Sequence, residues 1–244
     1  MAFPINHWFH FLKSHNTHRM TTMLEVLEDR LLPCFQNIEN EAQVKSDEAW
    51  QSFSGMACGE NGPMIDEGEA AEMAQAAGYE HYEALTVARQ TLLNSFAVST
   101  YHLWEQQLLA FHRRQLLRPW EETDARLFTL KEIEKRLQAV GVEASEFDSW
   151  KDMAIYRLLA NTIKHADGDS AERLKVLRPQ WFISPSLKDS HLPFPGIPIS
   201  RVYLPLAGED VFVTIDDVRA MVSSAVRFWT DLISGLEAAQ DLQP

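Results

Sequence analysis

The chain lacks the residue patterns that identify most metal-binding, secreted or membrane-embedded proteins. It has only two cysteines, Cys34 and Cys58, and neither lies in a Cys-x-x-Cys or Cys/His pattern, so a structural zinc site is not expected. Two unpatterned cysteines are typical of a reducing compartment. No apolar run approaches the roughly 18 residues that a membrane-spanning helix needs, so no membrane association is expected.

Common catalytic and targeting signatures are also missing. The sequence has no Gly-x-Gly-x-x-Gly, Walker A, Gly-x-Ser-x-Gly or His-Glu-x-x-His motif, which argues against dinucleotide oxidoreductases, P-loop NTPases, α/β-hydrolases and zincins. The first residues show no basic segment followed by an apolar one, as a signal peptide would. We therefore expect a cytoplasmic protein that needs no cofactor and no metal.

Positive charge is scarce. Thirty-five acidic side chains outnumber 22 basic ones, and the net charge is −13. Binding to a nucleic-acid backbone depends on Lys and Arg that neutralise phosphates, so unspecific coating of nucleic acid is disfavoured. Three interpretations stay open, namely a local basic pocket for RNA, a basic protein partner, and simple solubility.

What the sequence does contain is helical periodicity over most of its length. The longest pattern covers 79–117, where Leu85, Leu92, Phe96 and Leu103 recur on one face without an interrupting proline, which predicts a long helix. Gly78 is interpreted as the stop of a short acidic helix before it. Helices are also expected over 5–53 with a break at Pro33, and over 65–77, 129–141, 145–165, 169–177 and 214–238.

One segment near the C-terminal end departs from this pattern. Residues 184–200 hold four prolines and a glycine, which predicts a surface loop. Residues 201–206 and 210–213 are short β-like runs around Ala207-Gly208-Glu209, which predicts a small hairpin. We therefore expect one all-α domain over 1–244, a bundle of long antiparallel helices with a loop and hairpin insertion at 184–213 and a C-terminal helix.

Polar residues able to perform chemistry share one face near the end of the 145–165 helix. With Arg157 at zero on a helical wheel, Asn161 lies near 40°, Lys164 near −20° and His165 near 80°. Histidine can move a proton near neutral pH, and arginine or lysine can stabilise a developing phosphate charge. Cleavage of RNA through its 2′-hydroxyl would need only these groups and no metal.

The same residues also fit an ordinary helix end. Lys164 and His165 would complement the negative end of the helix dipole, Gly168 would supply a left-handed cap, and Asn161 would bond a neighbouring helix. The spacing alone favours this structural interpretation slightly over a functional one.

An upstream arginine followed by Asn-x-x-Lys-His at a helix end and a glycine-containing turn resembles the HEPN superfamily. Residues 150–169 carry the resemblance. It implies an all-α bundle found in prokaryotic toxins and in abortive-infection and other anti-phage systems, often a metal-independent ribonuclease. Active members commonly dimerise so that two signatures face each other, so a homodimer is expected.

Carried over residue by residue, the resemblance makes His165 the acid/base, Arg157 the phosphate clamp and Asn161 the orienting group. Lys164 and Asp167 would assist in substrate binding. The chain departs from the family pattern because seven residues separate Arg157 from His165 and Leu158 follows the arginine, where a polar residue is usual. Two hypotheses follow, a metal-independent endoribonuclease or its inactive relative, and a non-catalytic module that binds a protein partner through an acidic surface.

Other candidate residues have weaker support. Two histidine pairs with i,i+3 spacing near the N-terminus could ligate a metal, but no Glu-x-x-His accompanies them; packing or surface positions are favoured for His7, His10, His15 and His18. In a bundle, His102, Glu105, Glu80 or Glu83 could face His165 and tune it. The tryptophans are expected in the core, and Trp181 with Phe182 are the favoured exceptions for stacking on bases.

Overall fold

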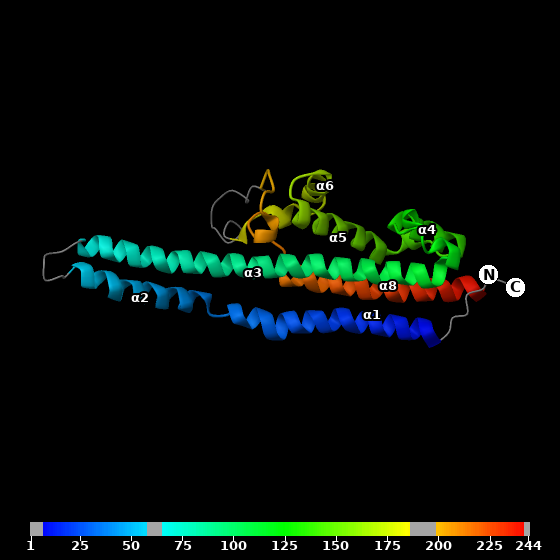
Figure 1. The fold of residues 1–244 in the computed structure, drawn as a ribbon, viewed down its shortest axis with the longest axis horizontal. Helices are drawn as coiled ribbons and strands as arrows, with labels where there is room; N and C mark the ends of the chain where they lie inside the picture. The colour runs from blue at the N-terminus through cyan, green and yellow to red at the C-terminus, as the bar shows by residue number, and fades with distance from the viewer. Residues whose placement is uncertain (1–6, 58–64, 186–198, 242–244) are drawn as a thin grey trace.

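A computed structural model describes residues 7–57, 65–185 and 199–241, and these residues fold into helices and connecting turns (Figure 1). The α-helices are α1 (His7–Val26), α2 (Ile38–Ala57), α3 (Glu67–Phe111), α4 (Leu130–Ala139), α5 (Asp148–His165), α6 (Asp169–Leu177) and α8 (Ile215–Asp241). The prediction of an all-α protein is confirmed for this part of the chain.

The centre of the molecule is a bundle built around α3. Helices α1 and α5 run in the direction opposite to α3, whereas α8 runs alongside α3 in the same direction (Figure 1). Apolar side chains at helical spacing on α8 all lie in the core: Val218, Met221, Val222, Ala225, Phe228, Trp229, Leu232 and Ile233. Trp104 of α3 packs edge-on against Phe228, with ring centroids 5.2 Å apart, so an edge-to-face aromatic contact joins the two parallel helices.

Helices α2 and α3 form an arm that projects beyond this bundle (Figure 1). The interpretation of Gly78 as a helix stop is wrong, because α3 continues through it from Glu67 to Phe111. A Cβ at Gly78 would lie 2.9 Å from the Ala42 carbonyl oxygen and 2.9 Å from the Ser46 Cβ. The glycine is therefore needed where two helices come close together, and not where a helix ends.

The predicted hairpin at 201–213 is also wrong. No strand occurs in the described segment 199–213, which contains a 3₁₀ turn at Pro205–Ala207. Pro205 cannot donate to a strand ladder, and the Asp210 carboxylate accepts hydrogen bonds from the backbone N–H groups of Tyr203 and Leu204, both at 2.7 Å. The apolar residues of the segment, including Val202, Val211 and Val213, are nevertheless buried.

Side chains from α3 replace the missing strand pairing. The fully buried Asn94 amide donates to the carbonyls of Pro205 at 2.7 Å and Val211 at 2.8 Å. Gln90 donates to the Val213 carbonyl at 2.9 Å. Because buried carbonyls need donors, these two amides hold the segment against the bundle as an irregular loop.

Candidate functional site

The polar stripe of the 145–165 helix lies at the solvent-exposed end of α5. Arg157, Lys164 and His165 are exposed, and Asn161 is half-buried. The other side of the same helix is buried through Leu159 and Ile163. The amphipathic pattern in the sequence thus puts all four polar side chains at or near the surface, as the helical wheel predicted.

Lys164 is the residue that connects this stripe to α3. Its Nζ lies 3.4 Å from Nε2 of His102, and Nδ1 of His102 lies 3.1 Å from a carboxylate oxygen of Glu105. Lysine can only donate, so Nε2 of His102 accepts the hydrogen bond from Lys164. Nδ1 then carries the hydrogen and donates a hydrogen bond to the Glu105 carboxylate. This arrangement describes a neutral imidazole held in one tautomer by its two neighbours.

The other oxygen of Glu105 accepts a hydrogen bond of 3.0 Å from the hydroxyl of Tyr101, a residue that the sequence did not single out. Burial, reinforced by the Glu105 carboxylate, raises the pKa of Tyr101 above its ordinary value of 10.0, while the charge of Arg157 acts in the opposite direction. Tyr101 therefore remains a neutral donor and fixes Glu105. Tyr101, Glu105, His102 and Lys164 form one continuous chain of polar contacts that ends at the surface.

The structure shows no contact of His102 or Glu105 with His165, although such a contact was one expectation from the sequence. His102 contacts Lys164, which precedes His165 in the chain. The His165 imidazole forms no hydrogen bond or ion pair with any described residue. The exposed imidazole is therefore available to solvent or to a ligand.

Arg157 lies two turns earlier and lines a separate pocket of about 190 Å³ between α3, α4 and α5. Its walls include the aromatic rings of Trp104 and Trp150 and the charged side chains of Lys131 and Glu134. His165 lies eight positions after Arg157, which is about 12 Å along the helix axis. The two side chains therefore serve different parts of this face.

Asp167 has partners within the protein. Its Oδ1 accepts the Val202 N–H at 2.9 Å and lies 3.6 Å from Nζ of Lys175, and its own N–H donates to the Val202 carbonyl at 3.1 Å. The turn before it begins at Ala166, which has φ 62° and ψ −138°. Ala166, directly after α5 and two residues before Gly168, thus carries a conformation that usually favours glycine.

The remaining candidates have mixed outcomes. Trp181 and Phe182, proposed as exposed stacking residues, are buried in the core, so that prediction is wrong; their backbone carbonyls accept hydrogen bonds from the N–H groups of Phe212 and Ile199. Among the tryptophans whose burial the structure describes, Trp120 is the exposed one, with the Arg118 guanidinium 5.4 Å from its ring centre. The side chains of His7 and His10 lie outside the described residues, among which no group of three His, Cys, Asp or Glu side chains could hold a metal.

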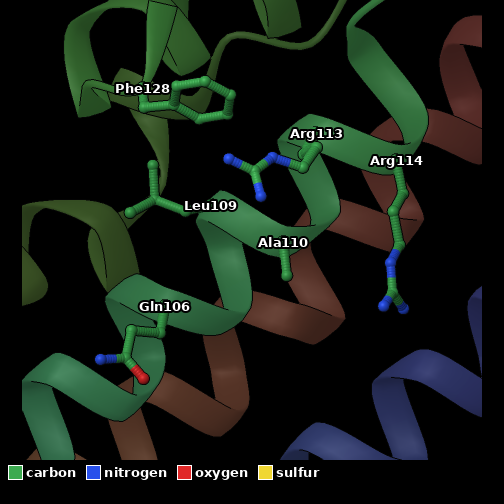
Figure 2. A pocket seen from close by; sticks show the side chains of 6 residues that line it. All are labelled: Gln106, Leu109, Ala110, Arg113, Arg114 and Phe128. Carbon is green, nitrogen blue, oxygen red and sulfur yellow. The ribbon is translucent and has the colours of Figure 1, made fainter. Parts of the chain in front are cut away.

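The basic residues near the end of the long helix were not among the site residues predicted from the sequence. In the structure, Arg113 and Arg114 lie in the π-helical turn His112–Leu116 and line one surface pocket (Figure 2), and Arg114 also lines a second pocket between α3 and α1. The adjacent arginines were visible in the sequence, but the aromatic wall opposite them comes from Phe128, fifteen residues further along.

Comparison with protein-family models, curated protein sequences and solved structures finds no match to this chain. Among the described residues, none of the helices has both the length and the apolar character needed to cross a membrane.

Proposed function

We propose that this protein is a HEPN-like, metal-independent endoribonuclease acting in prokaryotic defence or as a toxin. The observation that carries the proposal is the exposed end of α5, where Lys164 contacts His102 and is followed by the unpartnered His165. An ammonium group and two imidazoles belong to this one surface. These are the groups that RNA cleavage through a 2′-hydroxyl requires.

In the proposed reaction, one imidazole removes the proton from the 2′-hydroxyl and the other protonates the leaving 5′-oxygen. The Lys164 ammonium neutralises the charge that develops on the phosphate oxygens. Phosphate binding would draw Lys164 away from His102 and free the Nε2 lone pair, while Glu105 keeps the imidazole in the tautomer that can act as a base. No bond change in this route needs a metal.

The family resemblance assigns Arg157 as the phosphate clamp. With about 12 Å of helix between Arg157 and His165, we propose that Arg157 holds a part of the RNA next to the cleaved bond. Asn161, half-buried between them, would orient the strand. Asp167 would act indirectly, because its carboxylate fixes the turn after α5 through the Val202 N–H.

The test is cleavage of total cellular RNA in EDTA by the wild type and by His165→Ala, His102→Ala and Lys164→Ala. Loss of an acid or base is expected to lower the rate about 100-fold or more. His81→Ala is the matched control, because His81 lies on the same α3 helix about 32 Å from His102. An unchanged melting temperature would show that each variant is folded, and size-exclusion chromatography would test the expected homodimer.

Absence of cleavage by the wild type would contradict the nuclease proposal. If His165 serves only as a helix cap, His165→Ala loses about 0.5–1 kcal/mol of stability and no activity is affected. Equal cleavage by the wild type and all three variants would identify a contaminating ribonuclease.

A second candidate function is that of a non-catalytic binding module. The composition of the arm formed by α2 and the start of α3 favours it. Helix α2 and residues 67–86 of α3 carry nine carboxylates and one lysine, Lys45. Tyr79 and Tyr82 are exposed on the same arm, at 64% and 40% of their surface. A basic partner with apolar side chains would fit this surface.

That candidate predicts that a basic amphipathic peptide binds the wild type and binds Glu80→Lys/Glu83→Lys more weakly. The two glutamates are exposed, so their reversal is not expected to disturb the arm. Binding that is unaffected by the reversal would count against the acidic arm as a docking surface.

A further inference from the structure

A basic and aromatic surface lies at the C-terminal end of α3 and on the π-helical turn His112–Leu116 that continues it. One pocket, of about 340 Å³, is lined by Gln106, Leu109, Ala110, Arg113, Arg114 and Phe128 (Figure 2). A second, of about 330 Å³, lies between α3 and α1, and shares Gln106, Ala110 and Arg114 while adding Arg19 from α1. The two pockets flank a single exposed ridge of α3, and we call them together the arginine groove.

The arginines of this groove are not neutralised by carboxylates among the described residues. Arg19, Arg113 and Arg114 are exposed, and no carboxylate among the described residues forms an ion pair with them. In a chain with a net charge of −13, three unneutralised guanidinium groups around one groove are an unusual concentration of positive charge. They create a local binding site for an anion.

The Arg113 guanidinium has a specific orientation. It lies over the Phe128 ring at 4.4 Å from the centroid, whereas the Arg114 side chain extends away from it toward α1 (Figure 2). A guanidinium held against an aromatic ring keeps its outer face open for a further planar group. An unpaired nucleobase could stack there, and Arg114 and Arg19 could then contact the adjoining phosphates.

The arginine groove is also in line with the proposed catalytic residues. His102, Gln106 and Leu109 of α3 and Arg113 of the π-helical turn that follows are three or four residues apart, so they form one stripe. The stripe runs about 16 Å from His102, where Lys164 lies, to Arg113. A strand that follows it would connect the two sites without crossing a buried element.

We propose that the arginine groove binds single-stranded RNA and positions it for cleavage at the His102, Lys164 and His165 end of the stripe. The inference depends on the proposed nuclease function for the identity of its ligand. Single-stranded RNA fits better than a duplex, because a duplex keeps its bases stacked and cannot place one on Arg113. The mixed polar and apolar lining, with Gln106 beside Leu109 and Phe128, suits a base that is bound by its face and edge.

The experiment measures binding separately from cleavage. Fluorescence anisotropy follows a labelled single-stranded RNA of about 12 nucleotides that carries 2′-O-methyl groups and so cannot be cleaved through its 2′-hydroxyls. The proteins are the wild type, Arg113→Glu/Arg114→Glu, Arg113→Lys/Arg114→Lys and the control Arg227→Glu. Arg227 is exposed on α8 and lines neither pocket.

We expect the wild type and Arg227→Glu to bind equally, and the double glutamate variant to bind at least roughly tenfold more weakly with a shallower salt dependence. The double lysine variant keeps the charge but loses the planar stacking surface. It should therefore retain the salt slope and lose affinity, which an effect of folding would not produce. A duplex of the same sequence should bind more weakly than the single strand.

Equal binding by the wild type and the double glutamate variant would overturn the inference, and so would tighter binding of the duplex or no binding at all. The nuclease proposal fails differently. RNA binding that depends on Arg113 and Arg114 without any cleavage would support the arginine groove as an RNA-binding surface and contradict the nuclease proposal. Cleavage of natural RNA that is unaffected by Arg113→Glu/Arg114→Glu would support the nuclease proposal and contradict the role of the arginine groove in positioning RNA.

Discussion

Replacing Gly78 by alanine tests whether the arm depends on close contact between α2 and α3. In an isolated helix, this change stabilises by about 0.5–1 kcal/mol, because glycine loses more backbone freedom on folding. In the structure, the new Cβ would lie 2.9 Å from both the Ala42 carbonyl oxygen and the Ser46 Cβ. Neither atom is at the end of a flexible side chain, so the helices must separate.

Overpacking of this kind costs about 1–3 kcal/mol, which exceeds the gain in helix propensity. We therefore expect Gly78→Ala to destabilise the arm by about 1–2 kcal/mol, after the propensity gain is subtracted. If the arm unfolds together with the bundle, the melting temperature falls by about 2–8 °C. If it opens independently, amide hydrogen exchange in α2 and in residues 67–86 becomes faster while exchange in α8 stays unchanged.

Gly55→Ala is the matched control, since Gly55 lies in α2 and nothing lies within 4 Å of its added Cβ. This variant should be neutral or more stable by up to about 1 kcal/mol. Stability changes of opposite sign for Gly78→Ala and Gly55→Ala would support the close approach of the helices. A gain in stability for Gly78→Ala that matches the gain for Gly55→Ala would refute it.

Three further predictions concern the turn after α5, the irregular loop and a buried histidine. Ala166→Gly should raise the stability by about 1 kcal/mol in chemical denaturation, because glycine accepts φ 62° without strain; a loss would mean that Ala166 is not strained. Asn94→Ala should lower it by about 2–4 kcal/mol, since two buried carbonyls lose their donor; a neutral result would contradict the role of Asn94 in holding 205–213. Burial lowers the pKa of His112 below its ordinary 6.5, so the unfolded chain takes up this proton first and stability falls as the pH drops through 6.5. His112→Gln should show a weaker decline than the wild type over this range, and identical pH profiles would exclude the effect.

Local features of the fold could be predicted from the sequence because they depend on residues a few positions apart. The helix expected over 169–177 is observed as Asp169–Leu177, and the one expected over 214–238 as Ile215–Asp241. The Thr129 hydroxyl accepts the Glu132 N–H at 3.2 Å and caps the helix that was expected to begin at residue 129. Helical hydrogen bonds and caps join residues within one turn, so their signals remain contiguous in the chain.

Part of the candidate site could also be predicted from the sequence, and part of it could not. The exposed stripe of Arg157, Asn161, Lys164 and His165 follows from the period of one helix, and the sequence alone determined it. The partners of that stripe come from elsewhere. Lys164 meets His102 across 62 positions of sequence, and Arg113 meets Phe128 from a separate 3₁₀ and loop segment.

Tertiary structure also decided the features for which local signals were misleading. Glycine at position 78 is a helix breaker by propensity, but the gain from packing α2 against α3 outweighs that preference. Alternating apolar residues at 201–213 are typical of strands. In the structure, the backbone of that segment instead forms hydrogen bonds with the side chains of Asn94, Gln90 and Asp210. The sequence by itself determined the helices and their polar faces, and only the tertiary structure decided which faces meet, because burial and distant hydrogen bonds outweigh local preference by several kcal/mol.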